Sequence, residues 1–285
     1  MPGAYLRPES LDQALDALAA GGPGGAPWVV LAGATDHYPA RVGRAPREDI
    51  LDVTAIRPLR GVQAIEGGWR IGATTTWTDL VETPLPPLFD GLKAAALAVG
   101  GLQIQARGTV AGNVCNASPA ADGVPNLLAL DAVIELSSQA GLRTVPIGEF
   151  ATGNRRTVRS SDELVTGIVV PAALDGTTAR SSFEKLGSRA YLVISIAMVA
   201  AVVEVAAGRI ARARVAVGAC SEVAQRLPTL EAELVGEAAS ARTADLATAQ
   251  HLGALQPIDD VRATAAYRRD AALTCVRAAL RQVLA

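Results

Sequence analysis

The chain has 285 residues, half of them apolar, and a formal net charge of −2. That length suits two domains or one elaborate domain with a sizeable core, and so small a charge gives no electrostatic reason to expect binding to nucleic acid or to a membrane surface. The three cysteines are isolated and the two histidines are far apart in the sequence, which argues against a disulfide framework, a zinc or iron–sulfur site, or another metal centre within this chain.

The sequence has no recognisable targeting or membrane segment. Residues 1–5 show no basic stretch followed by an apolar run, so we expect no signal peptide. The longest apolar run, residues 191–203, is interrupted by Ser195 and is too short to span a bilayer. We therefore expect a cytoplasmic protein without a membrane span.

The first predicted elements are a helix and two strands. Ser10 is a candidate cap of a helix that Gly21–Pro23 ends. Residues 28–32 and 50–53 read as buried strands because they are mostly apolar without alternation. The first of these strands runs straight into the turn 33–37, and a glycine turn at the carboxyl end of a strand is typical of a phosphate nest.

The densest cluster of small residues in the chain is the turn-rich run 107–122. A hairpin over 61–73 and a helix over 88–99 precede it. Gly108 and Gly112 permit backbone angles that a bulky residue resists, and successive free N–H groups in such a turn suit phosphate oxygens. On composition alone, a loop that only reverses the chain is the more common explanation.

The remaining chain predicts a change in architecture near residues 172–178, a polar and small stretch that is the best domain boundary. Beyond it, three antiparallel strands covered by helices predict a small α+β domain. The expected elements after residue 122 are a helix at 124–130, strands at 132–136, 143–145, 164–170, 182–186, 196–205 and 210–219, and helices near 230–235, 244–252 and 267–284.

Two motifs resemble those of a known family. Residues 107–122, R-G-T-V-A-G-N-V-C-N-A-S-P-A-A-D, are close to the second flavin-binding motif R-G-T-I-G-G-N-…-A-S-P-x-x-D of the FAD-binding (medium) subunits of molybdenum hydroxylases, the carbon monoxide dehydrogenase and xanthine dehydrogenase family. Residues 32–36, A-G-A-T-D, resemble the family's first motif, A-G-G-[TQ]-[DS]. The resemblance extends from Y-L-R-P at 5–8 to P-I-D-D-V-R at 257–262.

The resemblance implies an α+β fold. A FAD-binding PCMH-type (vanillyl-alcohol-oxidase-like) domain would occupy residues 1–174, with subdomains of about 1–56 and 57–174. A small C-terminal domain, a three-stranded antiparallel sheet with helices, would follow at 175–285. The chain departs from the family pattern at Ala34 and Ala111, where glycine is usual; if either backbone needs a positive φ, alanine costs about 1 kcal/mol or more there.

The resemblance also implies a function, that of the FAD-carrying electron-transfer subunit of a heterotrimeric oxidoreductase. Electrons would pass from two 2Fe–2S clusters in a small partner subunit, through FAD here, to a small-molecule acceptor, while substrate is oxidised in a large molybdopterin subunit. The assembly would be a dimer of heterotrimers. Since FAD performs the redox chemistry, no catalytic side chain and no metal ligand is expected in this chain.

By position in the motifs, the resemblance assigns the FAD contacts. The two turns would hold the pyrophosphate, Asn116 and Asp122 would lie near the ribityl or adenosine part, Val165 near the adenine and Lys185 near the isoalloxazine ring, where a cation stabilises the reduced anion. The full set is Ala32, Gly33, Ala34, Thr35, Asp36, His37, Thr109, Val110, Ala111, Gly112, Asn113, Asn116, Asp122, Val165, Lys185 and Tyr191.

Several of these side chains have plainer explanations. Lys185 alone would be a solvated strand lysine. Tyr191 either stacks on the flavin or fills a domain seam, and His37 either contacts phosphate or ribose or is a partly exposed loop residue. Cys115 is expected to be a small apolar filler, and Asp260 to cap a helix that begins at residue 261.

Two other functions are compatible with parts of the sequence. A stand-alone FAD-dependent oxidoreductase of the same fold would need a substrate pocket with catalytic side chains over the flavin, and tyrosines are few here. A flavin-less scaffold subunit is suggested by Ala34 and Ala111. The sequence names neither the substrate nor the acceptor.

Overall fold

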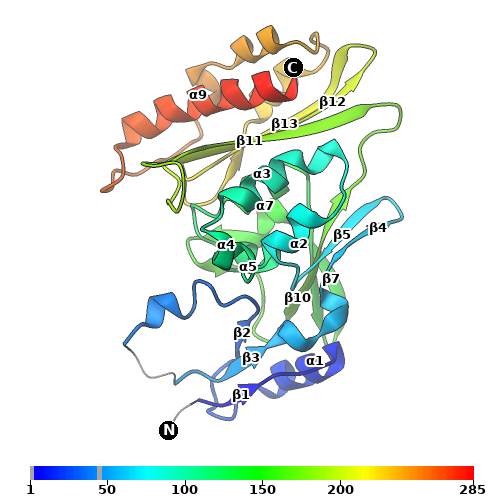
Figure 1. The fold of residues 1–285 in the computed structure, drawn as a ribbon, viewed down its shortest axis with the longest axis vertical. Coiled ribbons are helices and arrows are strands. Elements are labelled where there is room, and N and C mark those ends of the chain that lie inside the picture. The colour runs from blue at the N-terminus through cyan, green and yellow to red at the C-terminus, as the bar shows by residue number, and fades with distance from the viewer. Residues whose placement is uncertain (1–2, 44–46) are drawn as a thin grey trace.

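A computed structural model describes residues 3–43 and 47–285. Residues 1–2, part of the segment in which no signal peptide was expected, lie outside the described residues. Figure 1 shows an elongated chain in which three units follow one another from the N-terminal end to the C-terminal end. We call them the N-terminal, middle and C-terminal units.

The N-terminal unit packs one helix, α1 (Leu11–Ala20), on a three-stranded parallel sheet. The strand order is β1 (Tyr5–Leu6), β3 (Ile50–Asp52), β2 (Val29–Leu31). As predicted, Ser10 caps α1, since its hydroxyl oxygen accepts from the Gln13 N–H at 3.3 Å. Short 3-10 turns complete the unit: η1 (Pro39–Arg41), η2 (Val53–Ala55) and η3 (Arg57–Leu59).

The middle unit is built on a five-stranded antiparallel sheet. The predicted hairpin over 61–73 is confirmed, with a turn at Glu66–Gly67. The sheet order is β4 (Val62–Ile65), β5 (Gly68–Gly72), β10 (Leu164–Pro171), β6 (Val133–Ser138) and β7 (Gly141–Pro146).

Short helices surround this sheet. They are α2 (Trp77–Glu82), η4 (Pro87–Phe89), α3 (Asp90–Ala98), α4 (Leu102–Gln105), α5 (Val110–Cys115), α6 (Gly123–Ala129) and α7 (Ile147–Phe150), followed by the small hairpin β8 (Ala151–Gly153) and β9 (Arg156–Thr157). The run 107–122 was expected to be all turn, yet it contains α5. The helix forms because the Thr109 hydroxyl oxygen caps it, accepting from the Gly112 N–H at 3.0 Å, and because Val110, Ala111 and Val114 are buried.

The C-terminal unit is an antiparallel sheet between two layers of helices. Its strands are β11 (Thr178–Leu186), β12 (Ala197–Ala206), β13 (Arg209–Gly218) and β14 (Gln225–Arg226), so a two-residue fourth strand joins the three that were predicted. One face packs on α8 (Pro228–Leu234) and α9 (Ala265–Val283), and the other on α3 and α6 of the middle unit (Figure 1).

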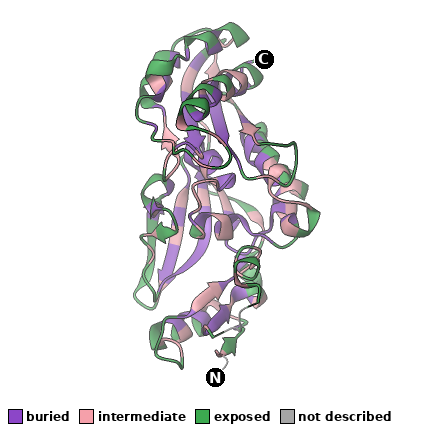
Figure 2. Cartoon of the chain, turned by 90° about the vertical axis from the view of Figure 1, so that its left-hand side faces the viewer, coloured by how far each residue is buried: buried purple, intermediate pink, exposed green. Residues whose placement is uncertain are grey.

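Alternate residues of β12 belong to two different cores. Met198, Ala200 and Val202 join the core of the middle unit, whereas Ala197 and Val199 join the core beneath α9. Figure 2 shows this buried character along the strands between the two helical layers. Because both faces of the strand are covered, its sequence is apolar without alternation.

Two predicted details of the C-terminal unit are wrong. The helix expected at 244–252 is two 3-10 turns, η5 (Ala241–Leu246) and η6 (Ala249–Leu252), separated because Thr248 is extended and caps the second turn. Asp260 does not begin a helix. Its carboxylate accepts from the Arg262 N–H at 2.8 Å in a local turn, and α9 starts later, capped by Thr264.

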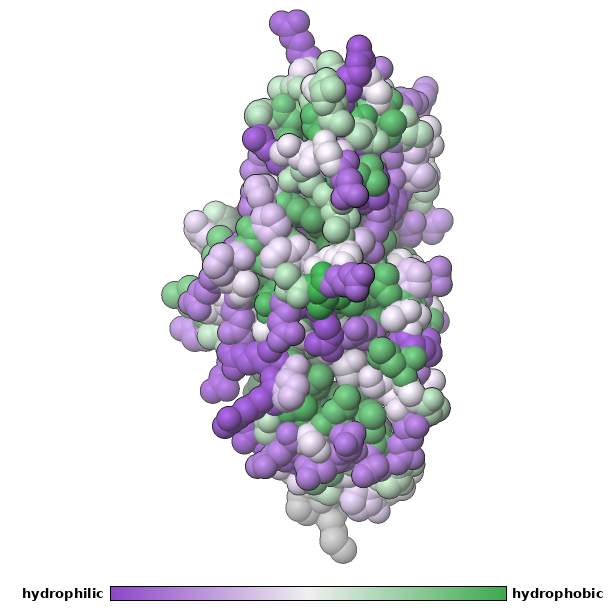
Figure 3. All heavy atoms as spheres, turned by 90° about the vertical axis from the view of Figure 1, so that its right-hand side faces the viewer, coloured by the Kyte–Doolittle hydropathy of each residue, from purple (hydrophilic) through white to green (hydrophobic). Residues whose placement is uncertain are grey.

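A helix that spans a membrane must be both long and apolar. None of the helices in the part of the chain that the structure describes combines the length and the apolar composition needed to cross a bilayer. On the face in Figure 3, hydrophilic side chains are interspersed with hydrophobic ones along the length of the molecule.

Candidate functional site

A pocket of about 680 Å³ lies where the N-terminal unit meets the middle unit, a size usual for small-molecule and cofactor sites. Its walls come from segments far apart in the sequence. They are the end of β2 with residues 32–37, which we call the first glycine turn, residues 107–113, which we call the second glycine turn, and the segments 115–122 and 192–194.

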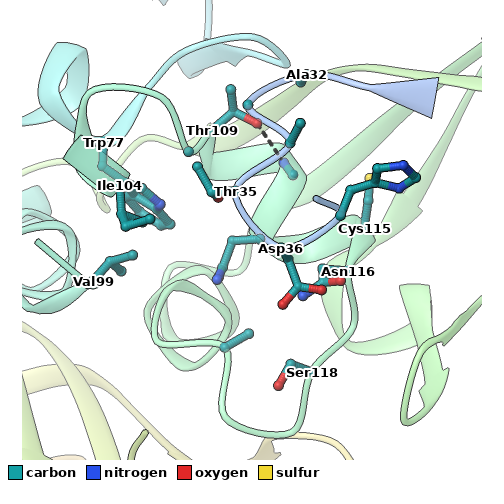
Figure 4. Close-up of a pocket in the computed structure, with 18 of the residues that line it drawn as sticks. Ala32, Thr35, Asp36, Trp77, Val99, Ile104, Thr109, Cys115, Asn116 and Ser118 are labelled. Atoms are coloured by element: carbon teal, nitrogen blue, oxygen red, sulfur yellow. Dashed lines mark hydrogen bonds between the residues drawn. The ribbon is translucent and has the colours of Figure 1, made fainter. Parts of the chain in front are cut away.

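The two glycine turns touch each other. A Cβ atom built on Gly33 would lie 2.0 Å from the carbonyl oxygen of Arg107, and one built on Gly108 would lie 3.3 Å from the Thr35 hydroxyl oxygen. Figure 4 shows Thr35 beside Thr109 in the pocket. Only a residue without a side chain fits at Gly33, so the sequence permits the two backbones to converge there.

Trp77 contacts Gly108 and Gly123, which lie on either side of the pocket wall formed by residues 109–122. We call this wall the second wall. The Trp77 backbone N–H donates to the Gly108 carbonyl at 3.1 Å. The ring is buried, lines the pocket, and lies so close to Gly123 that a Cβ there would come within 2.6 Å of it. Nothing in the sequence patterns placed this tryptophan at the site.

The polar side chains of the second wall are partly engaged. The Thr109 oxygen caps α5, and the Asn113 side-chain oxygen accepts from the Gly123 N–H at 3.2 Å. The Asn116 side-chain oxygen accepts from Arg155. Each of these three residues lines the pocket, and the Thr109 hydroxyl and the two amide groups still have hydrogen-bonding capacity for a ligand.

Asp122 lines the pocket at the seam with the C-terminal unit. Lys185 of β11 donates to its Oδ2 at 2.6 Å, and the Ser195 hydroxyl donates to its Oδ1 at 2.6 Å. The side chains of Lys185 and Asp122 are only 12% and 9% exposed. Burial raises the pKa of Asp122, while Lys185 and Ser195 oppose that rise. This ion pair therefore joins the pocket wall to the C-terminal sheet.

The loop before β12 closes another side of the pocket with aliphatic residues. Leu192, Val193 and Ile194 line it, whereas Tyr191 is outside the lining and 75% exposed. Val165 is the second residue of β10, buried and also outside the lining. The chain turns sharply at Leu192, whose φ is 53°, and Tyr191 precedes this turn and lies outside the pocket.

The base of this loop is held from α9. Arg268 is buried, donates to the Ile196 carbonyl at 2.6 Å and pairs with Asp260 at 2.7 Å. The Arg262 N–H, together with the guanidinium groups of Arg268 and Arg262, lowers the pKa of Asp260. Arg268 and Asp260 thus support the loop from inside the protein, and Asp260 does not cap a helix.

His37 and Cys115 both line the pocket. His37 is mostly buried, and its ring nitrogen is 3.7 Å from Glu48, which also binds Arg41 at 2.7 Å. Burial, with a smaller contribution from Arg41, lowers the pKa of His37, while Glu48 opposes that change. Cys115 is exposed toward the pocket, and none of the chain's cysteines, which all lie in its described part, forms a disulfide.

Arg155 is a pocket residue that the sequence analysis missed. It lies in the turn between β8 and β9 and donates to Asp36 Oδ2 at 2.7 Å and to the Asn116 side-chain oxygen. Its backbone N–H donates to the Ala117 carbonyl at 2.9 Å. Figure 4 shows Asp36 and Asn116 next to each other. The only sequence signal was a basic residue at a short hairpin turn.

The pocket gathers most, but not all, of the residues that the resemblance assigned. Val110 and Ala111 are buried in α5, and Val165, Lys185 and Tyr191 are also outside the lining; Lys185 approaches the pocket only through Asp122. The assigned residues that line the pocket are Ala32, Gly33, Ala34, Thr35, Asp36, His37, Thr109, Gly112, Asn113, Asn116 and Asp122.

The two departures from the family motifs differ in backbone conformation. Ala34 has a φ of 55°, in the left-handed region that favours glycine. Ala111 lies inside α5, where alanine is the better helix former. The expected cost of alanine therefore applies to the first glycine turn and not to the second.

Two carboxylates that line the pocket are engaged by neighbouring side chains. Asp122 is engaged by Lys185 and Ser195, and Asp36 by Arg155. Within residues 3–43 and 47–285 no cluster of histidine, cysteine, aspartate and glutamate side chains could hold a metal ion. The pocket thus offers backbone turns, hydroxyls and amides to a ligand.

Comparison with known proteins agrees along the chain. A family described as the FAD binding domain in molybdopterin dehydrogenase matches residues 1–173, and the CO dehydrogenase flavoprotein C-terminal domain matches residues 182–283. The glyceraldehyde dehydrogenase medium chain of Sulfolobus acidocaldarius is 29% identical over 98% of this chain and 97% of its own length. The xanthine dehydrogenase FAD-binding subunit of Escherichia coli O157:H7 is 36% identical, but the match spans only 43% of this chain and 42% of that relative.

A solved structure shows the same fold over the whole chain. Carbon monoxide dehydrogenase from Hydrogenophaga pseudoflava, in a form that lacks the Mo-pyranopterin moiety of the molybdenum cofactor, contains a chain with a TM-score of 0.87 and 28% identity, covering 99% of this chain and 97% of that one. The predicted fold class is thereby confirmed. This chain belongs to the FAD-binding medium subunits of the molybdenum hydroxylases, and it is an oxidoreductase subunit.

Proposed function

We propose that this chain is the electron-transfer subunit of a heterotrimeric molybdenum hydroxylase. It would take electrons from two 2Fe–2S clusters in a small partner subunit and deliver them through FAD to a small-molecule acceptor. The observation that supports this most is the contact of the two glycine turns at the edge of one pocket, because both turns carry the family's flavin motifs.

The residues of the pocket fit FAD. Gly33 allows the two glycine turns to meet, and the pocket wall carries hydroxyl and amide groups with remaining hydrogen-bonding capacity that suit a diphosphate and a ribityl chain. We propose that the first and second glycine turns hold the diphosphate, with Asn116 and Asp122 beside the ribityl or adenosine part. When bound, FAD supplies the redox chemistry, and the protein supplies position and electrostatics.

We propose that Lys185 acts on the flavin through Asp122. The lysine is paired with that carboxylate, so its charge reaches the pocket partly neutralised. Val165, within β10, and Tyr191, on the exposed loop, remain proposed contacts that would need the loop or the ligand to extend beyond the lining that the pocket has here.

We propose two domains, 1–174 and 175–285, with the first divided near residue 56. The linker between β10 and β11 supports the boundary, since it separates the five-stranded sheet from the four-stranded one. The large apolar contact of β11–β13 with α3 and α6 suggests that the two domains move as one body.

The partners are proposed from the relatives, which are medium chains or FAD-binding subunits by name. We propose a small iron–sulfur subunit and a large molybdopterin subunit, assembled as a dimer of heterotrimers in the cytoplasm. The substrate would be oxidised in the large subunit, which is why this chain needs no catalytic acid or base of its own.

Isolation of the tagged chain from its native cells tests this function. We expect it to copurify with two further polypeptides, with iron and molybdenum by elemental analysis, and with the visible absorbance of flavin. Flavin without iron and molybdenum would instead favour a stand-alone oxidoreductase. Iron and molybdenum without flavin would favour a flavin-less scaffold, and either result would overturn the proposal.

A further inference from the structure

Arg155 is the residue whose bonds reach both walls of the pocket. Its guanidinium donates to Asp36 in the first glycine turn at 2.7 Å and to the Asn116 side chain in the opposite wall. Its backbone N–H binds the Ala117 carbonyl beside Asn116 at 2.9 Å. Among the residues that line the pocket, this places one side chain as a bridge between two segments that the sequence separates widely.

The backbone at Arg155 is shaped for this bridge. The turn between β8 and β9 has Arg155 at a φ of 60°, in the left-handed region that disfavours a residue with a Cβ atom. Glycine would relieve that conformation but could not span the pocket. Unfavourable backbone geometry that a site retains is a recognised mark of a functional position.

The neighbouring cations do not perform this task. Arg41 also lines the pocket, but Glu48 binds its guanidinium at 2.7 Å and 2.9 Å, so its charge is already compensated. Arg156, the next residue after Arg155, is outside the lining and pairs at 3.3 Å with Glu222 of the C-terminal unit. Arg155 and Arg156 are adjacent in the sequence but bind different parts of the protein. Of these two, Arg155 is the one that bridges the pocket.

We propose that Arg155 is a positioning residue that holds the first glycine turn at its distance from the second wall, so that the pocket is preorganised for FAD. The inference rests on the proposed function of the pocket. In this inference the Arg155 guanidinium binds the Asp36 carboxylate and does not bind the FAD diphosphate itself. An ordered pocket binds its ligand more tightly because less freedom is lost on binding.

The test measures FAD affinity of the full chain by flavin fluorescence quenching. Arg155→Gly removes the side chain while keeping the backbone angle favourable. We expect its dissociation constant for FAD to rise about three- to fivefold, in line with a half-exposed ion pair, and Arg155→Lys to recover part of the loss. The matched control is Arg156→Ala, which should change the dissociation constant by less than about twofold.

A double-mutant cycle with Asp36→Ala separates positioning from direct contact. If Arg155 acts by holding Asp36, Arg155→Gly will have little further effect once Asp36 is alanine. If it binds the diphosphate, Arg155→Gly will weaken FAD binding as much or more in that background, which would overturn the inference. No effect of Arg155→Gly on a chain that binds FAD would also overturn it, whereas absence of FAD binding by the unaltered chain would overturn the proposed function itself.

Discussion

Gly33 and Arg107 approach so closely that a methyl group on the glycine would lie 2.0 Å from the arginine's carbonyl oxygen. The contact joins two segments that carry separate flavin motifs. It depends on a residue with no side chain, so the sequence at one position decides whether the two turns can meet. The FAD site that we propose follows from that contact.

Gly33→Ala should therefore disrupt the site. We expect the free energy of unfolding to fall by about 1–3 kcal/mol, the usual cost of an overpacked contact, and FAD affinity to fall at least tenfold. Urea unfolding and FAD titration measure the two effects. Gly253→Ala is the control, because a Cβ there meets its nearest neighbour at an ordinary 3.4 Å. Unchanged FAD affinity in Gly33→Ala would contradict the account.

The same substitution should have opposite effects at the two departures from the family motifs. Ala34→Gly relieves a left-handed alanine, so we expect the free energy of unfolding to rise by about 0.5–1 kcal/mol. Ala111→Gly loosens a buried helix position, so we expect a fall of about 1–2 kcal/mol. Urea unfolding of both variants without FAD checks the signs, and two changes of equal sign would show that the backbone assignment is wrong.

Lys185→Met should leave the Asp122 carboxylate buried with only Ser195 as partner. We expect a loss of about 2–4 kcal/mol at neutral pH, as for other broken buried pairs. Without the lysine, the already raised pKa of Asp122 rises further. A folded-state pKa above the unfolded one makes stability fall as the pH rises through it, so the loss will be smallest in acid.

The remaining lysine of the chain supplies the control for that experiment. Lys93 donates to the Thr83 carbonyl at 2.6 Å and has no carboxylate partner among the described residues, so Lys93→Met should cost no more than about 1 kcal/mol. Chemical unfolding of both variants across a pH series is the measurement. Equal, pH-independent losses would mean that the Lys185–Asp122 pair has no special role.

Asp260→Asn should weaken the support of the loop before β12. Arg268 is buried and would lose its ionised partner, so we expect a loss of about 1–3 kcal/mol at pH 7. The pKa of Asp260 is lowered in the folded chain, so the stability it contributes is present above about pH 4 and is lost as the pH falls through the folded pKa. The difference between the two proteins should then narrow in acid.

Asp259→Asn is the control for this prediction. Asp259 accepts from the Ala265 N–H at 2.5 Å and has no ion-pair partner in the described part of the chain. It should lose less stability than Asp260→Asn. Thermal unfolding at pH 7 and at about pH 3 distinguishes the two residues, and a gap that widens in acid would be inconsistent with a lowered pKa.

The sequence predicted the local elements well where one physical pattern dominated. The apolar run 196–205 predicts a buried strand, and the glycine after residue 32 predicts a turn. The structure contains both the strand and the turn. The helix α5 escaped prediction because Gly112 and Asn113 are poor helix formers. Its cap at Thr109 and its buried face, which outweigh that preference, depend on tertiary packing.

The composition of the pocket could be predicted only in part. The resemblance placed both glycine turns, yet it could not show that they touch, because contact between distant segments depends on the whole fold. The sequence could not place Arg155 at the pocket, since its partners Asp36 and Asn116 lie far from it in the sequence. Tyr191 lies outside the lining because the backbone turns at Leu192, and nothing in the sequence predicts a left-handed conformation at a leucine.

The most direct test of the account is calorimetric titration of the purified chain with FAD, with riboflavin and with ADP. A pocket in which two glycine turns grip the diphosphate should bind one FAD per chain, bind riboflavin far more weakly, and release FAD in competition with ADP. If riboflavin binds as tightly as FAD, or if ADP fails to compete, the two turns do not hold a diphosphate and the central claim is contradicted.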